Sequence, residues 1–116
     1  MDSSEIVLRV VRSGDVVEAI TWRADEAPEP GEQEAKAFVL ALWDAKHKSA
    51  LRIDLWTRDM TVDDMNDFFF QTLMTMADTY ANATTFGPLA GEIKVFAQEF
   101  AEKAARAARR SLGESR

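Results

Sequence analysis

The sequence predicts a small α+β domain in which a four-stranded antiparallel sheet, made of two hairpins, is followed by two helices packed on it. In the first half, apolar residues alternate with a period of two over paired segments that are joined by short polar turns. In the second half they recur every three or four residues, which is typical of amphipathic helices. The length of 116 residues fits one domain that covers residues 1–116.

The first hairpin is expected at residues 5–23, where β-branched residues are frequent and the alternation is imperfect. Gly14 lies in its turn, since glycine can adopt a positive φ at no steric cost. Residues 24–35 then break the pattern with two prolines, a glycine and five acidic residues. This acidic segment is predicted to be a loop.

The second hairpin is expected at residues 36–57. Its first strand is apolar on both faces, which indicates a sheet covered on both sides. Its second strand alternates cleanly, so that Leu51, Ile53 and Leu55 are expected to face inward. Trp56 falls on the opposite, outward face.

Two helices are expected, at residues 61–82 and 88–111. Thr61 and Asp64 have the spacing of a capping box, with aspartate in place of the usual glutamate or glutamine. Pro88 suits the first turn of the second helix. The first helix has more than one apolar stripe, and we therefore expect it to contact more than one neighbour.

The sequence contains no recognisable catalytic constellation, and we predict that the protein is not an enzyme. It has no cysteine, which excludes disulfides, thiolate metal sites and a thiol nucleophile. The one histidine, His47, lies in a polar turn and has no nucleophile near it in the sequence. The acidic residues at 59–67 lack the glycine of a calcium-binding loop. No catalytic, cofactor-binding or metal-binding residue is predicted.

The charge and hydropathy of the chain limit its partners and its location. A net charge of −6 opposes nucleic-acid binding, which depends on cations at the phosphates. No apolar run reaches the roughly 20 residues of a membrane span, so no membrane insertion is predicted. The N-terminus lacks the pattern of a signal peptide, and we expect a cytoplasmic protein.

The aromatic residues are the feature of the sequence that most indicates a function. There are more of them than are required to fill one core-facing side of each strand and helix. They form either a second core layer or a surface for self-association or a partner, since apolar patches and aromatic residues mark interfaces. A homodimer is the expected assembly. The predicted contact residues are Trp43, Trp56, Phe68 and Phe70.

Two stretches carry a resemblance to a known family: Leu51-Arg52-Ile53-Asp54-Leu55-Trp56 and Thr72-Leu73-Met74-Thr75-Met76-Ala77-Asp78-Thr79. Together and in this order, they resemble the gliding-motility-associated protein GldC family. The resemblance implies a small cytoplasmic protein associated with bacterial surface gliding, with no enzymatic activity, no cofactor and no transferable site residues. The predicted function is that of a non-enzymatic accessory protein that acts through protein–protein contacts.

An alternative function rests on topology alone. Four antiparallel strands followed by two helices resemble the bacterial export chaperone SecB, which binds unfolded chains through apolar grooves. A concave apolar groove would favour such a client-binding module, and a flat self-complementary patch would favour a dimer.

Overall fold

Five strands and two helices make up residues 1–114, the part of the chain that the computed structural model describes. All strands lie in one compact unit, Met1–Met60, and both helices lie in a second unit that begins at Thr61. The predicted α+β class is confirmed. A single domain over residues 1–116, helices packed on the sheet and a SecB-like topology stay predictions.

The first sheet contains three antiparallel strands in the order β1-β2-β3. They are β1 (Ile6–Ser13), β2 (Val16–Ala24) and β3 (Gln33–Ala35). The turn between β1 and β2 places Gly14 at a φ of 62°, as its sequence position predicts. Val17 and Ile20 on β2 are buried and form the core of this unit.

The second sheet contains only β4 (Ala37–Asp44) and β5 (Ser49–Trp56), which pair with each other. Both predicted hairpins are present, but the single four-stranded sheet is wrong. The physical reason is the short strand β3, which pairs with residues 20–22 of β2. Because β3 occupies the free edge of β2, the second hairpin cannot extend the first sheet there.

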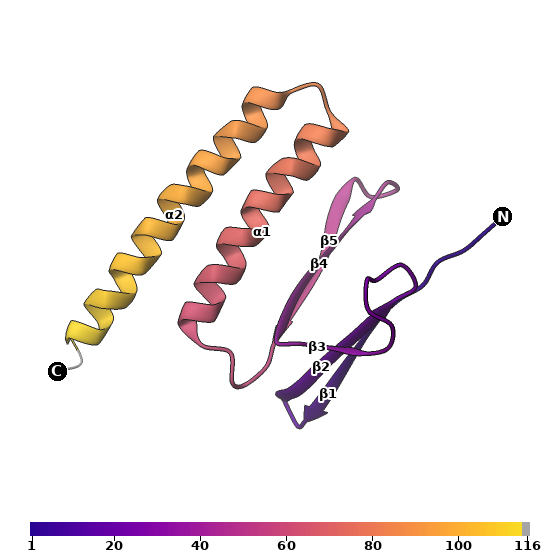
Figure 1. The fold of residues 1–116 in the computed structure, drawn as a ribbon, viewed down its shortest axis with the longest axis horizontal. Coiled ribbons are helices and arrows are strands. Elements are labelled where there is room, and N and C mark those ends of the chain that lie inside the picture. Colours follow the sequence, from indigo (N-terminus) through magenta and orange to yellow (C-terminus); the bar gives the residue numbers. More distant parts are fainter. Residues whose placement is uncertain (115–116) are drawn as a thin grey trace. The chain divides into compact units, whose positions relative to one another are not determined.

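The helical unit is an antiparallel pair, α1 (Val62–Ala83) and α2 (Gly87–Glu114), whose ribbons run side by side (Figure 1). The capping box at the start of α1 is confirmed, since Thr61 accepts a hydrogen bond from the amide of Asp64 and the Asp64 carboxylate accepts one in return. Pro88 lies in the first turn of α2, as predicted.

Small residues form the centre of the contact between the helices. Ala77 on α1 and Ala90 and Ala97 on α2 are buried. Their short side chains let the two backbones approach closely. The ring centroids of Phe69 on α1 and Phe100 on α2 lie 6.4 Å apart across the same contact.

Candidate functional site

The hairpin formed by β4 and β5 has one face that is apolar except at its tip, where Asp44 lies opposite Ser49. Residues that are directly opposite in an antiparallel pair point to the same side of the sheet. Besides the polar pair at the tip, the register therefore assigns three apolar cross-strand pairs to this face, and we call these six residues the aliphatic face although they include one phenylalanine. These pairs are Phe38 with Leu55, Leu40 with Ile53, and Leu42 with Leu51.

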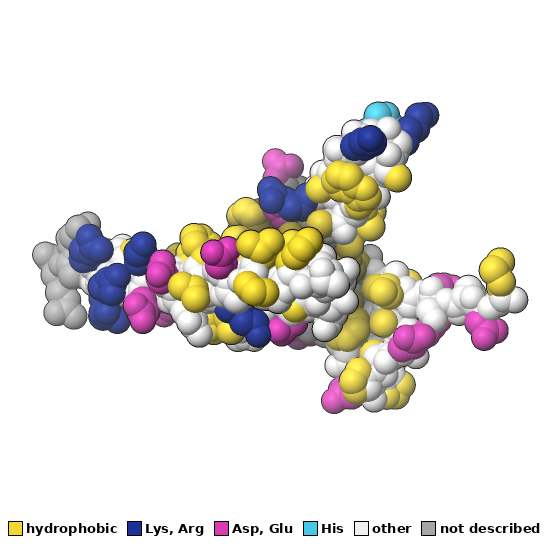
Figure 2. Space-filling view, turned by 90° about the horizontal axis from the view of Figure 1, so that it is seen from above, with side chains coloured by type: hydrophobic (Ala, Val, Ile, Leu, Met, Phe, Trp, Pro, Cys, Tyr) yellow, Lys and Arg dark blue, Asp and Glu magenta, His cyan; other side chains and the backbone are white. Residues whose placement is uncertain are grey.

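Most of the aliphatic face is open to solvent. Leu42 and Ile53 are 57% and 56% exposed, and Leu40 and Leu51 are also exposed, whereas Phe38 and Leu55 near the base are half-buried. Figure 2 shows apolar side chains along the hairpin that carries the single histidine at its tip. The prediction that Leu51 and Ile53 face a buried interior is wrong, because a two-stranded sheet has no second layer of its own to cover them.

The opposite face of the hairpin is mixed and carries two of the predicted contact residues. Trp43 is 69% exposed and lies opposite Ala50, near the turn. Trp56 is 55% exposed and lies opposite Ala37, at the base. The two indoles share this face but lie about 20 Å apart along the strands, at about 3.3 Å per residue. They are therefore two separate exposed aromatic positions.

The tip of the hairpin is fixed by Asp44. Its carboxylate accepts hydrogen bonds from the backbone amides of Lys46 and His47, at 3.0 and 3.4 Å, and lies 2.7 Å from Nδ1 of His47. The side-chain hydrogen bond with His47 lowers the pKa of Asp44 more than any other contact. His47 is therefore held in a turn, as predicted, and its contacts are structural.

A second set of contacts closes the base of the hairpin, and one of them, from Arg58 to Val17, reaches the first sheet. The amide of buried Thr57 donates to the carbonyl of Lys36 at 2.8 Å, and the amide of Arg58 donates to the carbonyl of Val17 at 3.1 Å. Asp59 accepts hydrogen bonds from Lys36 Nζ and from Thr57 Oγ1, both at 2.6 Å. The hydrogen bond from Lys36, then that from Thr57, lowers the pKa of Asp59 to about 2.

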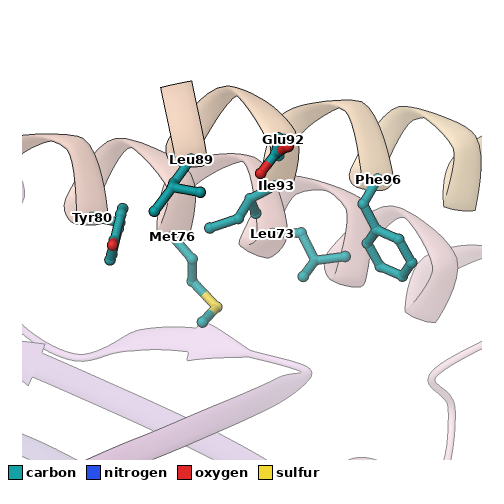
Figure 3. A pocket seen from close by; sticks show the side chains of 7 residues that line it. All are labelled: Leu73, Met76, Tyr80, Leu89, Glu92, Ile93 and Phe96. Atoms are coloured by element: carbon teal, nitrogen blue, oxygen red, sulfur yellow. The ribbon is translucent and has the colours of Figure 1, made fainter. Parts of the chain in front are cut away.

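The helical unit has its own apolar surface, an open hollow of about 600 Å³ between α1 and α2 (Figure 3). Its lining is apolar except for Glu92 and the hydroxyl of Tyr80. Met76 and Phe96 are each 57% exposed at its rim. The lining residues are Leu73, Met76, Tyr80, Leu89, Glu92, Ile93 and Phe96.

The other two predicted contact residues belong to α1 and lie outside this hollow. Phe68 is half-buried and makes an edge-to-face contact with Phe69, with ring centroids 6.2 Å apart. Phe70 is also half-buried. The assignment of Trp43, Trp56, Phe68 and Phe70 as contact residues stays a prediction.

Sequence reasoning did not predict that the apolar residues of the second hairpin are exposed. Leu51 and Ile53 were predicted to face inward but are 54% and 56% exposed. The pairing of two such strands in a hairpin was itself the available signal, because an isolated hairpin cannot bury either of its faces.

The described residues contain no group of three potential metal-ligating side chains gathered in one place. Within the same part of the chain, neither helix has an apolar stretch long enough to cross a membrane.

The fold defined by these elements is an α+β arrangement of two antiparallel sheets and a helical pair. Residues 17–106 match the family described as gliding motility-associated protein GldC-like, and because this match covers most of the chain, the protein belongs to that family. The resemblance seen in the sequence is thereby confirmed, and the family indicates an association with gliding motility. No curated protein and no solved structure shows significant similarity to the chain.

Proposed function

We propose that this protein is a non-enzymatic, cytoplasmic accessory protein of gliding motility that works as a homodimer and contacts a further protein partner. The observation that carries the proposal is the solvent-exposed apolar surface of the hairpin β4–β5, on both of its faces. Contiguous apolar patches on a protein surface are typical of protein–protein contact sites. Membership of the GldC-like family supplies the process in which such contacts would act.

The state of the two shifted carboxylates supports a non-enzymatic function. A general acid or base works best with a pKa near the operating pH. The pKa values of Asp44 and Asp59 are instead lowered, in each case by hydrogen bonds that fix one end of the hairpin. Both side chains serve the shape of the hairpin.

The proposal is tested in a gliding bacterium that lacks its own member of the family. We expect this chain to restore single-cell gliding speed, and the double variant Trp43→Ala/Trp56→Ala to restore less of it at equal protein level. A matched control is Glu29→Ala in the acidic segment, which should restore gliding fully. Full restoration by the double variant would contradict a contact role of the indoles, and no restoration by the wild type would contradict the function.

A second candidate function, client binding in the manner of SecB, is favoured by one observation, the open apolar hollow between α1 and α2. A chaperone of this kind would suppress the aggregation of a reduced, unfolded model protein at stoichiometric amounts. The variant Met76→Asp at the exposed rim would abolish that suppression, because it places a charge among apolar side chains. Unchanged light scattering of the aggregating protein in the presence of the wild type would eliminate this candidate.

A further inference from the structure

We propose that the C-terminal part of helix α2 is a docking surface for an acidic segment of a partner protein. Its four cations are Lys103, Arg106, Arg109 and Arg110, and we call them the basic surface. This inference rests on the proposed function in taking a further protein as the partner, and it deepens that function by naming the chemistry that the partner presents. It involves one helix and does not require the protein to be a homodimer.

The four cations lie close together on one side of α2. Positions three or four residues apart are neighbours on a helix surface, and Arg106 has this spacing to each of the other three. All four side chains are exposed, and every residue between them is alanine. Figure 2 shows Lys and Arg side chains gathered toward the C-terminal end of α2. Because alanine side chains are short, the cations project beyond them and can be reached from outside.

The stability of α2 does not account for the basic surface. Like charges at these spacings destabilise a helix. The helix dipole favours cations only within the last turn, and the last turn of α2 contains no basic residue. Glu99 and Glu102 lie four residues before Lys103 and Arg106, but among the described residues none of the four cations forms an ion pair. The four positive charges are therefore available to an anionic partner.

The composition and length of the basic surface indicate carboxylates on a short segment. Three of its four residues are arginine, and a guanidinium binds a carboxylate through two parallel hydrogen bonds. From Lys103 to Arg110 the surface extends about 10 Å along the helix, at about 1.5 Å per residue. An extended segment of about four residues covers that length at about 3.3 Å each. A segment with several Asp and Glu residues in close succession matches it.

An extended anionic surface fits less well than a short segment. Without these four cations the chain has 20 acidic residues against ten basic ones, since it has 14 basic residues in all. A DNA duplex or a lipid bilayer is wider than the basic surface, so it also meets acidic residues such as Glu99 and Glu102 on the preceding turn. A membrane-surface helix further needs large apolar side chains, and residues 103–110 have only alanine beside the cations.

The first experiment titrates the full chain into a labelled hexaglutamate peptide and follows fluorescence anisotropy. We expect the dissociation constant to rise about tenfold or more between about 20 and 200 mM salt, because exposed ion pairs are screened. Arg106→Gln/Arg110→Gln should weaken the binding about tenfold at low salt through the loss of two ion pairs. Circular dichroism should show an unchanged helix content, since glutamine is a good helix former.

The matched control removes two cations from another part of the chain. Lys46→Gln/Lys48→Gln changes the net charge by the same amount, at exposed positions in the turn of the hairpin β4–β5, and should leave peptide binding unchanged. Equal losses in the two double variants would show that only net charge matters and would overturn the inference. No binding of the peptide by the wild type at low salt would also overturn it.

A second experiment uses the wild type and does not depend on the folding of variants. Peptide carboxylates activated by a carbodiimide form amide bonds with lysine amines that lie next to the bound peptide. We expect Lys103 to carry at least about fivefold more peptide than Lys46 or Lys48 by mass spectrometry, because docking raises the local concentration of carboxylates. Equal labelling of the three lysines would contradict docking on α2.

Other occupants of the basic surface, and failure of the proposed function, give different results. Tighter binding to phosphatidylserine vesicles or to a DNA duplex than to the peptide, lost in Arg106→Gln/Arg110→Gln, would assign the surface to a membrane or to nucleic acid and sink the inference. If the peptide does not bind but the wild type restores gliding, the inference fails while the proposed function stands. If the peptide binds but gliding is not restored, the proposed function fails and the acidic ligand stands.

Discussion

At the residue scale, two ionisable side chains with shifted pKa values, Asp44 and Asp59, stabilise the hairpin β4–β5. Asp44 organises its tip, and Asp59 holds its base by accepting hydrogen bonds from Lys36, just before β4, and from Thr57, just after β5. Arg58 adds an ion pair of 3.1 Å with Glu18 on β2. These partners lie far apart in the sequence or across a turn, so the spacing of the acidic residues alone does not predict their roles.

The stability contributed by Asp59 should depend on pH at the acidic end. Its pKa in the folded protein is lowered to about 2, below the unfolded value of about 3.9. The ionised carboxylate therefore stabilises the fold fully above the unfolded pKa, and this contribution is lost as the pH falls through about 2. Asp59→Asn should lower the free energy of unfolding at pH 6, and its difference from the wild type should shrink between about pH 4 and 2.

Urea unfolding of the two proteins at a series of pH values measures this effect. Lys36→Gln is the matched variant, because it removes the largest cause of the lowered pKa and should reduce the same pH dependence. A difference between Asp59→Asn and the wild type that stays constant down to pH 2 would contradict the prediction.

At the element scale, local sequence patterns predicted most of the strands and helices. Which strands pair with each other, and which faces are buried, depends on residues far away in the sequence. Alternation predicted which residues of the second hairpin share a face, because a strand has a period of two. It did not predict whether that face is covered, since burial depends on other elements. Strand β3 was missed because it lies in an acidic, proline-rich stretch, and its pairing with β2 is made by the backbone.

The start of helix α1 should lose stability when its cap is removed. The Thr61 side chain accepts a hydrogen bond of 3.0 Å from the amide of Asp64, which has no partner within the helix. Thr61→Ala should reduce the free energy of unfolding by about 1 kcal/mol. Thr79→Ala in the middle of the same helix is the control and should cost much less, because its hydroxyl only bonds back to the carbonyl of Thr75.

The close approach of the two helices should not tolerate a larger residue at its centre. Ala97 is fully buried against α1, so Ala97→Leu forces extra methyl groups into filled space. We expect a loss of about 1 to 3 kcal/mol in the free energy of unfolding, measured in urea. Ala107→Leu, on an exposed position of α2, should change stability by less than about 0.5 kcal/mol. Equal losses would show that the helices do not meet at Ala97.

At the scale of the whole molecule, the charge of the chain should keep it away from nucleic acids. Binding to a phosphate backbone depends on cations that displace counterions, and this chain has 20 acidic against 14 basic residues. We expect no measurable binding to a generic DNA duplex or RNA at physiological salt, by fluorescence anisotropy at micromolar protein. Salt-sensitive binding in that range would contradict this prediction.

The surface that the chain leaves exposed should make its stability depend on its own concentration. If the dimer is the unit that unfolds, dissociation accompanies unfolding, and mass action raises the melting temperature as the protein concentration rises. For a chain of this length we expect a rise of about 3 °C for each tenfold increase, measured by calorimetry over a hundredfold range.

Ile53→Asp separates this effect from ordinary heat stability. The variant should melt at a lower temperature than the wild type, and its melting temperature should not change with concentration, because its aliphatic face cannot be buried without stranding a carboxylate. A wild-type melting temperature that stays constant over the hundredfold range would mean that one chain unfolds alone.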